Sequence, residues 1–166
     1  MTGFRRYAFP LLHLWHAVLA GGFLVAYLTA DEDTYAMHLF AGYVVLAAIA
    51  VRILAGVFAP AGNVWRLPRP SIGGTLAWFA RRRGRNPFFV WFAVALLGSV
   101  GLAAATGAVA DFVTRVEDLH EGISEASLWI IVGHIVFILA IYKGRRIRAW
   151  LQDHLGARRP VKEIAP

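Results

Sequence analysis

Four long apolar stretches, separated by polar segments, dominate the pattern of this chain. They occupy residues 8–28, 36–59, 87–110 and 117–142. Each approaches the length of about twenty apolar residues that a membrane-spanning helix needs. The pattern predicts an all-α, membrane-embedded four-helix bundle with four transmembrane helices, forming a single domain over residues 1–166. A soluble bundle with buried helices is the alternative, but 58% hydrophobic and 16% charged residues favour the membrane.

The connections between these stretches differ in length. Asp31–Tyr35 and Asp111–Val116 are short, which favours antiparallel neighbours in a compact bundle. The middle segment, residues 60–86, is longer and contains "IGGTLAWFARRR". This stretch predicts a short amphipathic helix on the membrane surface, with Trp78 and Phe79 facing lipid and the arginines facing headgroups. The tail after Lys143 is expected to behave similarly.

The charged residues separate into two sets along the chain. Eight of the ten acidic residues lie in the two short connections or at the start of the fourth span, with Arg115 as the single basic residue among them. Most arginines lie at the opposite ends of the spans, in the middle segment and in the tail. The positive-inside rule then places both termini and the middle segment in the cytoplasm. The net charge of +7 therefore indicates topology and lipid headgroups rather than nucleic acid.

The chemistry-bearing side chains are histidines, because the chain has no cysteine. Disulfides, iron–sulfur clusters and covalently attached haem are thereby excluded. The six histidines are His13, His16, His38, His120, His134 and His154. An ionisable group inside a membrane usually has a partner or a function, and imidazole is a common metal ligand. His154 lies in the charged tail and is expected to be solvated.

His120 and His134 are fourteen residues apart on the fourth span, so they share a helix face. They stand about 21 Å apart along the helix axis, which is too far for one metal ion. The separation suits two cofactors at different depths of a bilayer core about 30 Å thick. The fourth span would then provide one ligand to each of two b-type haems.

Depth in the membrane supplies a partner for each of these histidines. His16 lies ten residues after Arg6, and His134 lies nine residues before Lys143, so both have a similar inner depth. His38 and His120 both lie near the outer acidic clusters. We therefore predict that His16 and His134 bind the iron of an inner haem, and that His38 and His120 bind the iron of an outer one. The alternative is that these are membrane histidines that only donate hydrogen bonds to neighbouring helices.

Four short motifs, in order along the chain, resemble the bacterial cytochrome b561 family. They are "HLFAGYVVLAAIAVR", "GRNP", "ATG" and "LHE" followed by His134. The family includes the di-haem membrane subunits of nickel–iron hydrogenases and formate dehydrogenases. The resemblance covers nearly the whole chain and implies one haem ligand on the first span, one on the second and two on the fourth.

The first span departs from the family pattern. The family usually has Arg, two residues and then His-Trp, whereas "HLWHAV" has His13 in place of the Arg and Ala17 in place of the Trp. Counting back from "AYLTADE" aligns His16 with the ligand, and His13 remains the alternative. His13, one turn earlier on the same face, would then contact a haem propionate or a quinone.

Two residues of the second span complete the expected site. Arg52 is fourteen residues after His38, so it shares that face and is expected to bind a propionate of the inner haem. An arginine snorkelling from the end of the span is the alternative. Gly42, four residues after His38, would let a porphyrin approach the backbone.

Two haems at different depths indicate electron transfer across the membrane, with no catalytic side chain in the protein itself. The first hypothesis is an electron-transfer component between a periplasmic redox protein and the quinone pool. The partner would be a hydrogenase, a dehydrogenase or a c-type cytochrome, and the quinone would bind near His13, Trp65 or Arg66. A stand-alone superoxide:quinone oxidoreductase is the second hypothesis, although Arg115 is the only positive charge at the outer end. A non-redox bundle is the third.

Overall fold

The computed structural model describes residues 3–81, 84 and 86–156. Within these residues all regular structure is helical, with no strand. Four helices are long and apolar enough to cross a membrane: α1 (Gly3–Leu28), α2 (Tyr35–Phe58), α4 (Phe88–Ala110) and α5 (Glu117–Gly156). The predicted all-α architecture with four candidate spans is therefore confirmed, and the chain is built as a multi-pass membrane protein.

The chain divides into two compact units, Met1–Ile130 and Ile131–Pro166. The first unit contains α1, α2, the short helix α3 (Ile72–Arg81), α4 and the beginning of α5. The second contains the remainder of α5, which ends at Gly156. Arg82, Arg83 and Arg85, and the part of the tail after Gly156, lie outside the described residues.

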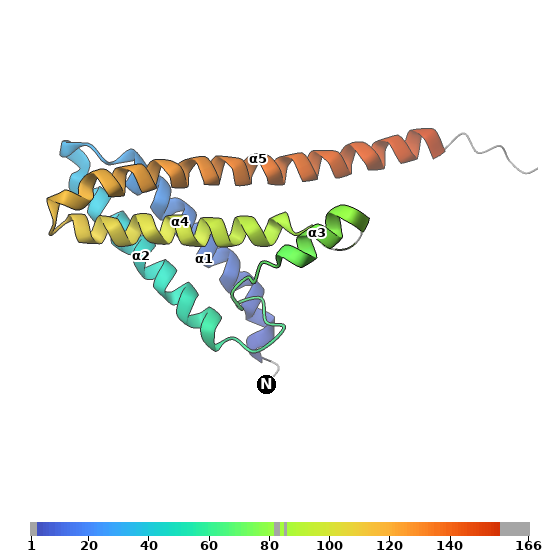
Figure 1. The fold of residues 1–166 in the computed structure, drawn as a ribbon, viewed down its shortest axis with the longest axis horizontal. Coiled ribbons are helices and arrows are strands. Elements are labelled where there is room, and N and C mark those ends of the chain that lie inside the picture. Colours follow the sequence, from blue (N-terminus) through green and yellow to red (C-terminus); the bar gives the residue numbers. More distant parts are fainter. Residues whose placement is uncertain (1–2, 82–83, 85, 157–166) are drawn as a thin grey trace, which may run out of the picture. The chain divides into compact units, whose positions relative to one another are not determined.

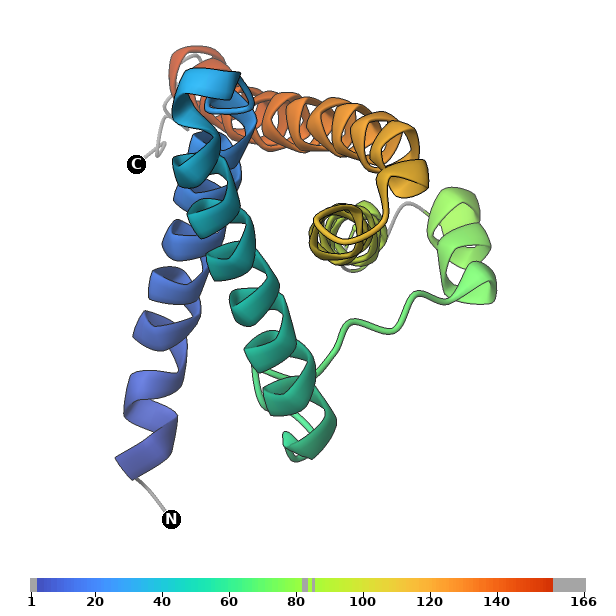
Figure 2. The same ribbon diagram turned by 90° about the vertical axis from the view of Figure 1, so that its left-hand side faces the viewer.

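Helices α1 and α2 form an antiparallel hairpin (Figures 1 and 2). The turn between them contains the 3-10 helix η1 (Glu32–Thr34), so the predicted short connection is present. One face of α2 is buried, at positions spaced three or four residues apart: Ala41, Val45, Ala48, Arg52 and Gly56. A Cβ atom at Gly22 of α1 would lie 3.0 Å from Val45 Cγ2. The small residue at position 22 therefore allows the two helices to pack closely.

Helix α4 packs against the same helix, α2. A Cβ atom at Gly101 would lie 3.4 Å from Ile49 Cγ2, which is close packing between the two helices. After Ala110 a short turn with the 3-10 helix η2 (Thr114–Val116) leads into α5. Because α5 has 40 residues, the expected amphipathic tail is a continuation of the fourth span rather than a separate helix.

Helix α3 confirms the helix expected in the middle segment, with one difference in side-chain placement. Ser71 caps its N-terminus, since the Gly74 N–H donates to Ser71 Oγ at 3.1 Å. Trp78 was expected to face lipid beside Phe79, but it is half-buried, with its ring centroid 6.3 Å from that of Phe88. Phe79 also contacts Phe88, with ring centroids 5.9 Å apart, but it stays 46% exposed, so Trp78 is the more buried of the two rings.

Candidate functional site

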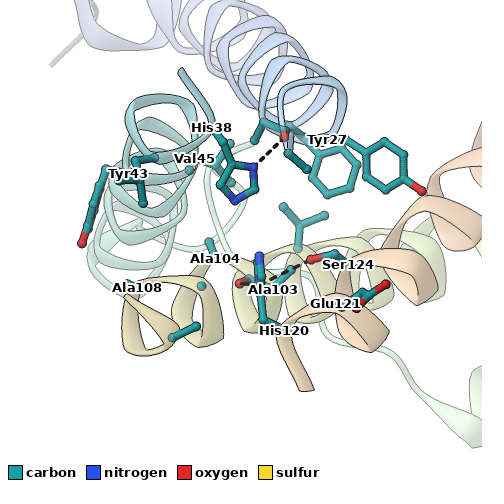
Figure 3. A pocket seen from close by; sticks show the side chains of 18 of the residues that line it. Tyr27, His38, Tyr43, Val45, Ala103, Ala104, Ala108, His120, Glu121 and Ser124 are labelled. Atoms are coloured by element: carbon teal, nitrogen blue, oxygen red, sulfur yellow. Dashed lines mark hydrogen bonds between the residues drawn. The ribbon is translucent and has the colours of Figure 1, made fainter. Parts of the chain in front are cut away.

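His38 and His120 lie side by side in the first compact unit, although they are far apart in the sequence. His38 is on the first turn of α2 and His120 is on the first turn of α5. Their ring centroids are 6.0 Å apart and the ring planes make an angle of 73°. Figure 3 shows both rings in the lining of one pocket, His38 from α2 and His120 from α5. The fold therefore brings together the two histidines that the sequence assigned to the outer haem.

Each of these rings is held by a backbone carbonyl. His38 Nδ1 lies 2.7 Å from the Ala26 carbonyl oxygen of α1, and His120 Nδ1 lies 2.9 Å from the Ala103 carbonyl oxygen of α4. A carbonyl oxygen can only accept, so Nδ1 carries the proton in both rings. The lone pair is then on Nε2, the nitrogen left to bind a metal ion. Histidine ligands in metalloproteins are usually oriented by a hydrogen bond of this kind.

The two rings are close enough to contact one bound group. With metal–nitrogen bonds of about 2 Å, two rings whose centroids are 6.0 Å apart would both be within reach of one metal ion placed between them. No group of three or more potential metal-ligating side chains occurs among the described residues. Within the part of the chain that the structure describes, the side chains that could bind a metal ion here are thus the two imidazoles, His38 and His120.

A cavity of about 930 Å³ surrounds the two histidines. This volume lies within the range of about 300–1,000 Å³ for small-molecule and cofactor sites. Much of its wall consists of small residues: Ala26, Gly42, Ala103, Ala104, Gly107 and Ala108. Such a wall leaves room for a large, flat apolar molecule close to the helix backbones.

Two glycines in this wall have different roles. A Cβ atom at Gly107 would lie 2.8 Å from His120 Cε1, so the ring rests directly on the backbone of α4. At Gly42 a Cβ atom would meet nothing within 4 Å, and Gly42 lines the cavity. A side chain at position 42 would therefore extend into the open space. The expected role of Gly42, close approach of a porphyrin to the backbone, remains a prediction that this opening supports.

Three tyrosines and three glutamates also line the cavity. The ring of Tyr35 stacks on His38, with centroids 5.9 Å apart and planes at 13°. The Tyr43 hydroxyl donates to Asp111 Oδ2 at 3.1 Å, which links α2 to the end of α4. Three carboxylates line the cavity, Glu117, Glu121 and Glu125, whereas no described Lys or Arg does. The cavity wall is therefore negatively charged.

The inner pair of histidines belongs to different compact units. His16 is exposed on α1, with its ring 6.4 Å from that of Trp15, and His134 is half-buried on α5 in the second unit. Their pairing at an inner haem stays a prediction. His13 is exposed and donates from Nδ1 to the Phe9 carbonyl oxygen, one turn earlier on α1, at 2.9 Å.

Arg52 is buried, with 7% of its surface exposed, so it does not snorkel to the surface. Its guanidinium donates to the carbonyl oxygens of Trp65 and Arg66. The same group lies 5.7 Å from the Trp15 ring centroid and 5.6 Å from that of Trp65. Arg52 thus fixes the segment after α2 against the hairpin. Its expected contact with a haem propionate remains a prediction.

Three residues that position the histidine rings were not assigned this role from the sequence: Gly107, Ala103 and Ala26. Gly107 belongs to the "ATG" motif and was given no role of its own in the sequence, but it supports the His120 ring. The available signal was its depth, since Gly107 and His120 each lie four residues from the connection between α4 and α5. The two alanines contribute backbone carbonyls, which side-chain identity does not reveal.

No family model, no curated protein and no solved structure matches the chain.

Proposed function

We propose that this protein is a di-haem b-type cytochrome that transfers electrons across the cytoplasmic membrane. It would connect a periplasmic redox protein with the quinone pool. The observation that carries the proposal is the His38–His120 pair, with ring centroids 6.0 Å apart and each Nδ1–H donating a hydrogen bond to a backbone carbonyl oxygen. Resemblance of the sequence to the bacterial cytochrome b561 family supports the same conclusion.

The residues around the pair fit an iron porphyrin. His38 and His120 would hold the outer haem iron through Nε2, and His16 and His134 would hold the inner one. The small residues of the cavity wall leave space for the macrocycle, and Gly42 adds open space beside α2. Bound haem supplies a one-electron carrier whose potential depends on its ligands and surroundings. The carbonyls of Ala26 and Ala103 keep the imidazoles oriented and raise their basicity.

The orientation of the chain in the membrane follows from the charges in the sequence. Both termini and residues 60–86 would lie in the cytoplasm, and the short acidic connections would lie in the periplasm. The outer haem would then be near the periplasmic surface. Glu117, Glu121 and Glu125 line the cavity there, and their charge suits a basic docking surface on the redox partner. A quinone would exchange electrons near the inner haem.

The superoxide:quinone oxidoreductase hypothesis is less well supported. A superoxide anion is attracted by positive potential. Three glutamates line the outer cavity, and none of the described cationic residues does. This charge distribution favours a cationic partner surface over a small anionic substrate.

The decisive experiment is haem quantification with reduced-minus-oxidised spectra on purified protein and on single histidine variants. We expect two protohaems per chain in the wild type. His38→Ala and His120→Ala should lose the same haem, and His16→Ala and His134→Ala should lose the other. His13→Ala should retain both haems.

Two results would contradict the proposal at different levels. Fewer than two protohaems per chain in gently extracted wild-type protein would refute the di-haem assignment. Loss of a haem in His13→Ala, together with retention of both in His16→Ala, would transfer the inner ligand to His13. Steady superoxide turnover by the purified protein without a partner would favour the second hypothesis.

A further inference from the structure

Helix α3 carries large apolar side chains that are exposed in the first compact unit, although the Phe79 ring also lies 5.9 Å from that of Phe88 at the start of α4. Ile72, Leu76 and Phe79 are spaced four and three residues apart, so they share one face of the helix. Ile72 is 70% exposed, Leu76 is 65% exposed and Phe79 is 46% exposed. Large apolar side chains aligned on one side of a short helix indicate a surface that is not in contact with water in the assembled protein.

The contacts of α3 with α4 place this stripe at the end of a membrane span. Trp91, in the first turn of α4, donates from Nε1 to Thr75 Oγ1 of α3 at 3.0 Å. Trp78 of α3 lies against Phe88, the first residue of α4. Since α4 is a candidate span that begins at Phe88, these contacts would put α3 at the level where hydrocarbon meets headgroups. Aromatic side chains concentrate at this level in membrane proteins.

The charged residues in and around α3 are all basic. Arg69 before the helix and Arg81 in its last turn are both exposed. The sequence continues with further arginines at positions 82, 83 and 85, and it has no acidic residue between Asp33 and Asp111. A protein partner would need both an apolar groove and a separate acidic surface. A bilayer with anionic headgroups provides the apolar and the negative environment together.

We propose that α3 is an interfacial helix whose Ile72–Leu76–Phe79 stripe is inserted at the boundary of acyl chains and headgroups. Arg69 and Arg81 bind the phosphate groups of anionic phospholipids beside it. This role concerns lipid and is independent of the haem sites. It assigns α3 as a lipid-binding element that anchors the segment between the second and third spans.

The absence of cysteine makes the proposal easy to test by spin labelling of the full-length protein in vesicles. Nitroxide labels at Leu76→Cys and Ile72→Cys report the stripe, and Ala77→Cys reports an exposed position on the other side of α3. Collision with oxygen measures contact with lipid, and collision with a water-soluble nickel chelate measures contact with water. We expect a several-fold higher oxygen-to-nickel ratio at positions 72 and 76 than at position 77.

The role of the arginines is tested with the same labels. Vesicles of phosphatidylcholine with added phosphatidylglycerol should raise the oxygen-to-nickel ratio at position 76 compared with pure phosphatidylcholine. Arg81→Gln should reduce this response, because each arginine near an anionic surface favours binding about fivefold. High salt should reduce it as well.

Two outcomes would overturn insertion in lipid. One is an equal, nickel-rich accessibility at positions 72, 76 and 77, which would mean that the stripe faces water. The other is a label at position 76 that is immobile and shielded from both reagents, which would mean that protein covers the stripe. A lipid-exposed label that responds neither to phosphatidylglycerol nor to Arg81→Gln would overturn the binding of anionic headgroups.

Discussion

Replacing Gly107 by alanine adds one methyl group at the point where the His120 ring rests on α4. The new Cβ atom would lie 2.8 Å from His120 Cε1, 3.1 Å from Nδ1 and 3.3 Å from Nε2. Ordinary contacts begin at 3.4 Å, so the ring must move by about 0.6 Å, the difference between 3.4 and 2.8 Å. All three contacts are on the same ring, and the movement therefore displaces the expected iron ligand itself.

The cost of this movement can be estimated from two effects. Overpacking by one methyl group costs about 1–3 kcal/mol. The displaced ring also weakens its 2.9 Å hydrogen bond to the Ala103 carbonyl oxygen, an interaction worth about 1 kcal/mol. If 1–3 kcal/mol of this is lost from cofactor binding, haem affinity falls by about 5- to 150-fold.

The assay is haem content per chain after detergent extraction, together with a redox titration of each haem. We expect Gly107→Ala to retain the inner haem and to lose, or shift the potential of, the outer one. Gly98→Ala is the matched control, because it is the same substitution in the same helix and its added Cβ atom meets nothing within 4 Å. This control variant should bind both haems with wild-type potentials.

Full retention of two haems with unchanged potentials in Gly107→Ala would refute the assignment of His120 as a ligand held against α4. Loss of both haems in Gly98→Ala would show that added bulk anywhere in α4 disturbs the bundle. The experiment would then have to be repeated with Gly107→Ser, judged by the same two measurements.

Three further predictions concern the cavity and its surroundings. Gly42→Leu should extend into the cavity and remove one haem, whereas Gly21→Leu, also at an open position, should leave haem content unchanged. Arg52→Ala should lower the free energy of unfolding by about 2–4 kcal/mol. It removes charged hydrogen bonds to two carbonyls and the contacts with two tryptophan rings. Thermal unfolding followed by circular dichroism checks this. Tyr43→Phe should retain both haems and leave the unfolding temperature almost unchanged in the same assay, since the lost bond to Asp111 is exposed to solvent.

The spans were predictable because membrane helices leave a strong local signal. The ends of α2 and α4 lie within one residue of the predicted boundaries, since a charged or proline-containing segment follows each apolar run. The short connections were predictable for the same reason. The extent of α5 was underestimated, because the basic residues that end the apolar stretch at Tyr142 do not end the helix.

The contacts of individual side chains were harder to predict. Arg52 has its partners in the segment after α2, and one of its aromatic neighbours, Trp15, lies on α1. Trp78 of α3 lies against Phe88, a residue of the next helix, α4. A helical period gives the face on which a residue lies, but not which neighbouring helix or loop covers that face. Only tertiary structure supplies this information.

The hydrogen bonds of the histidine pair show why the site depends on backbone positions as well as on imidazoles. The carbonyl of Ala26 is available to His38 because α1 ends at Leu28, so the last turn leaves carbonyls without a helical partner. The carbonyl of Ala103 lies inside α4, where it can still reach His120 because position 107, one turn later, has no side chain. The end of α1 and the glycine at position 107 thus each leave a backbone carbonyl accessible to a histidine ring. Lengthening α1 by a turn should therefore disturb His38 as Gly107→Ala disturbs His120, and both changes should affect the same haem.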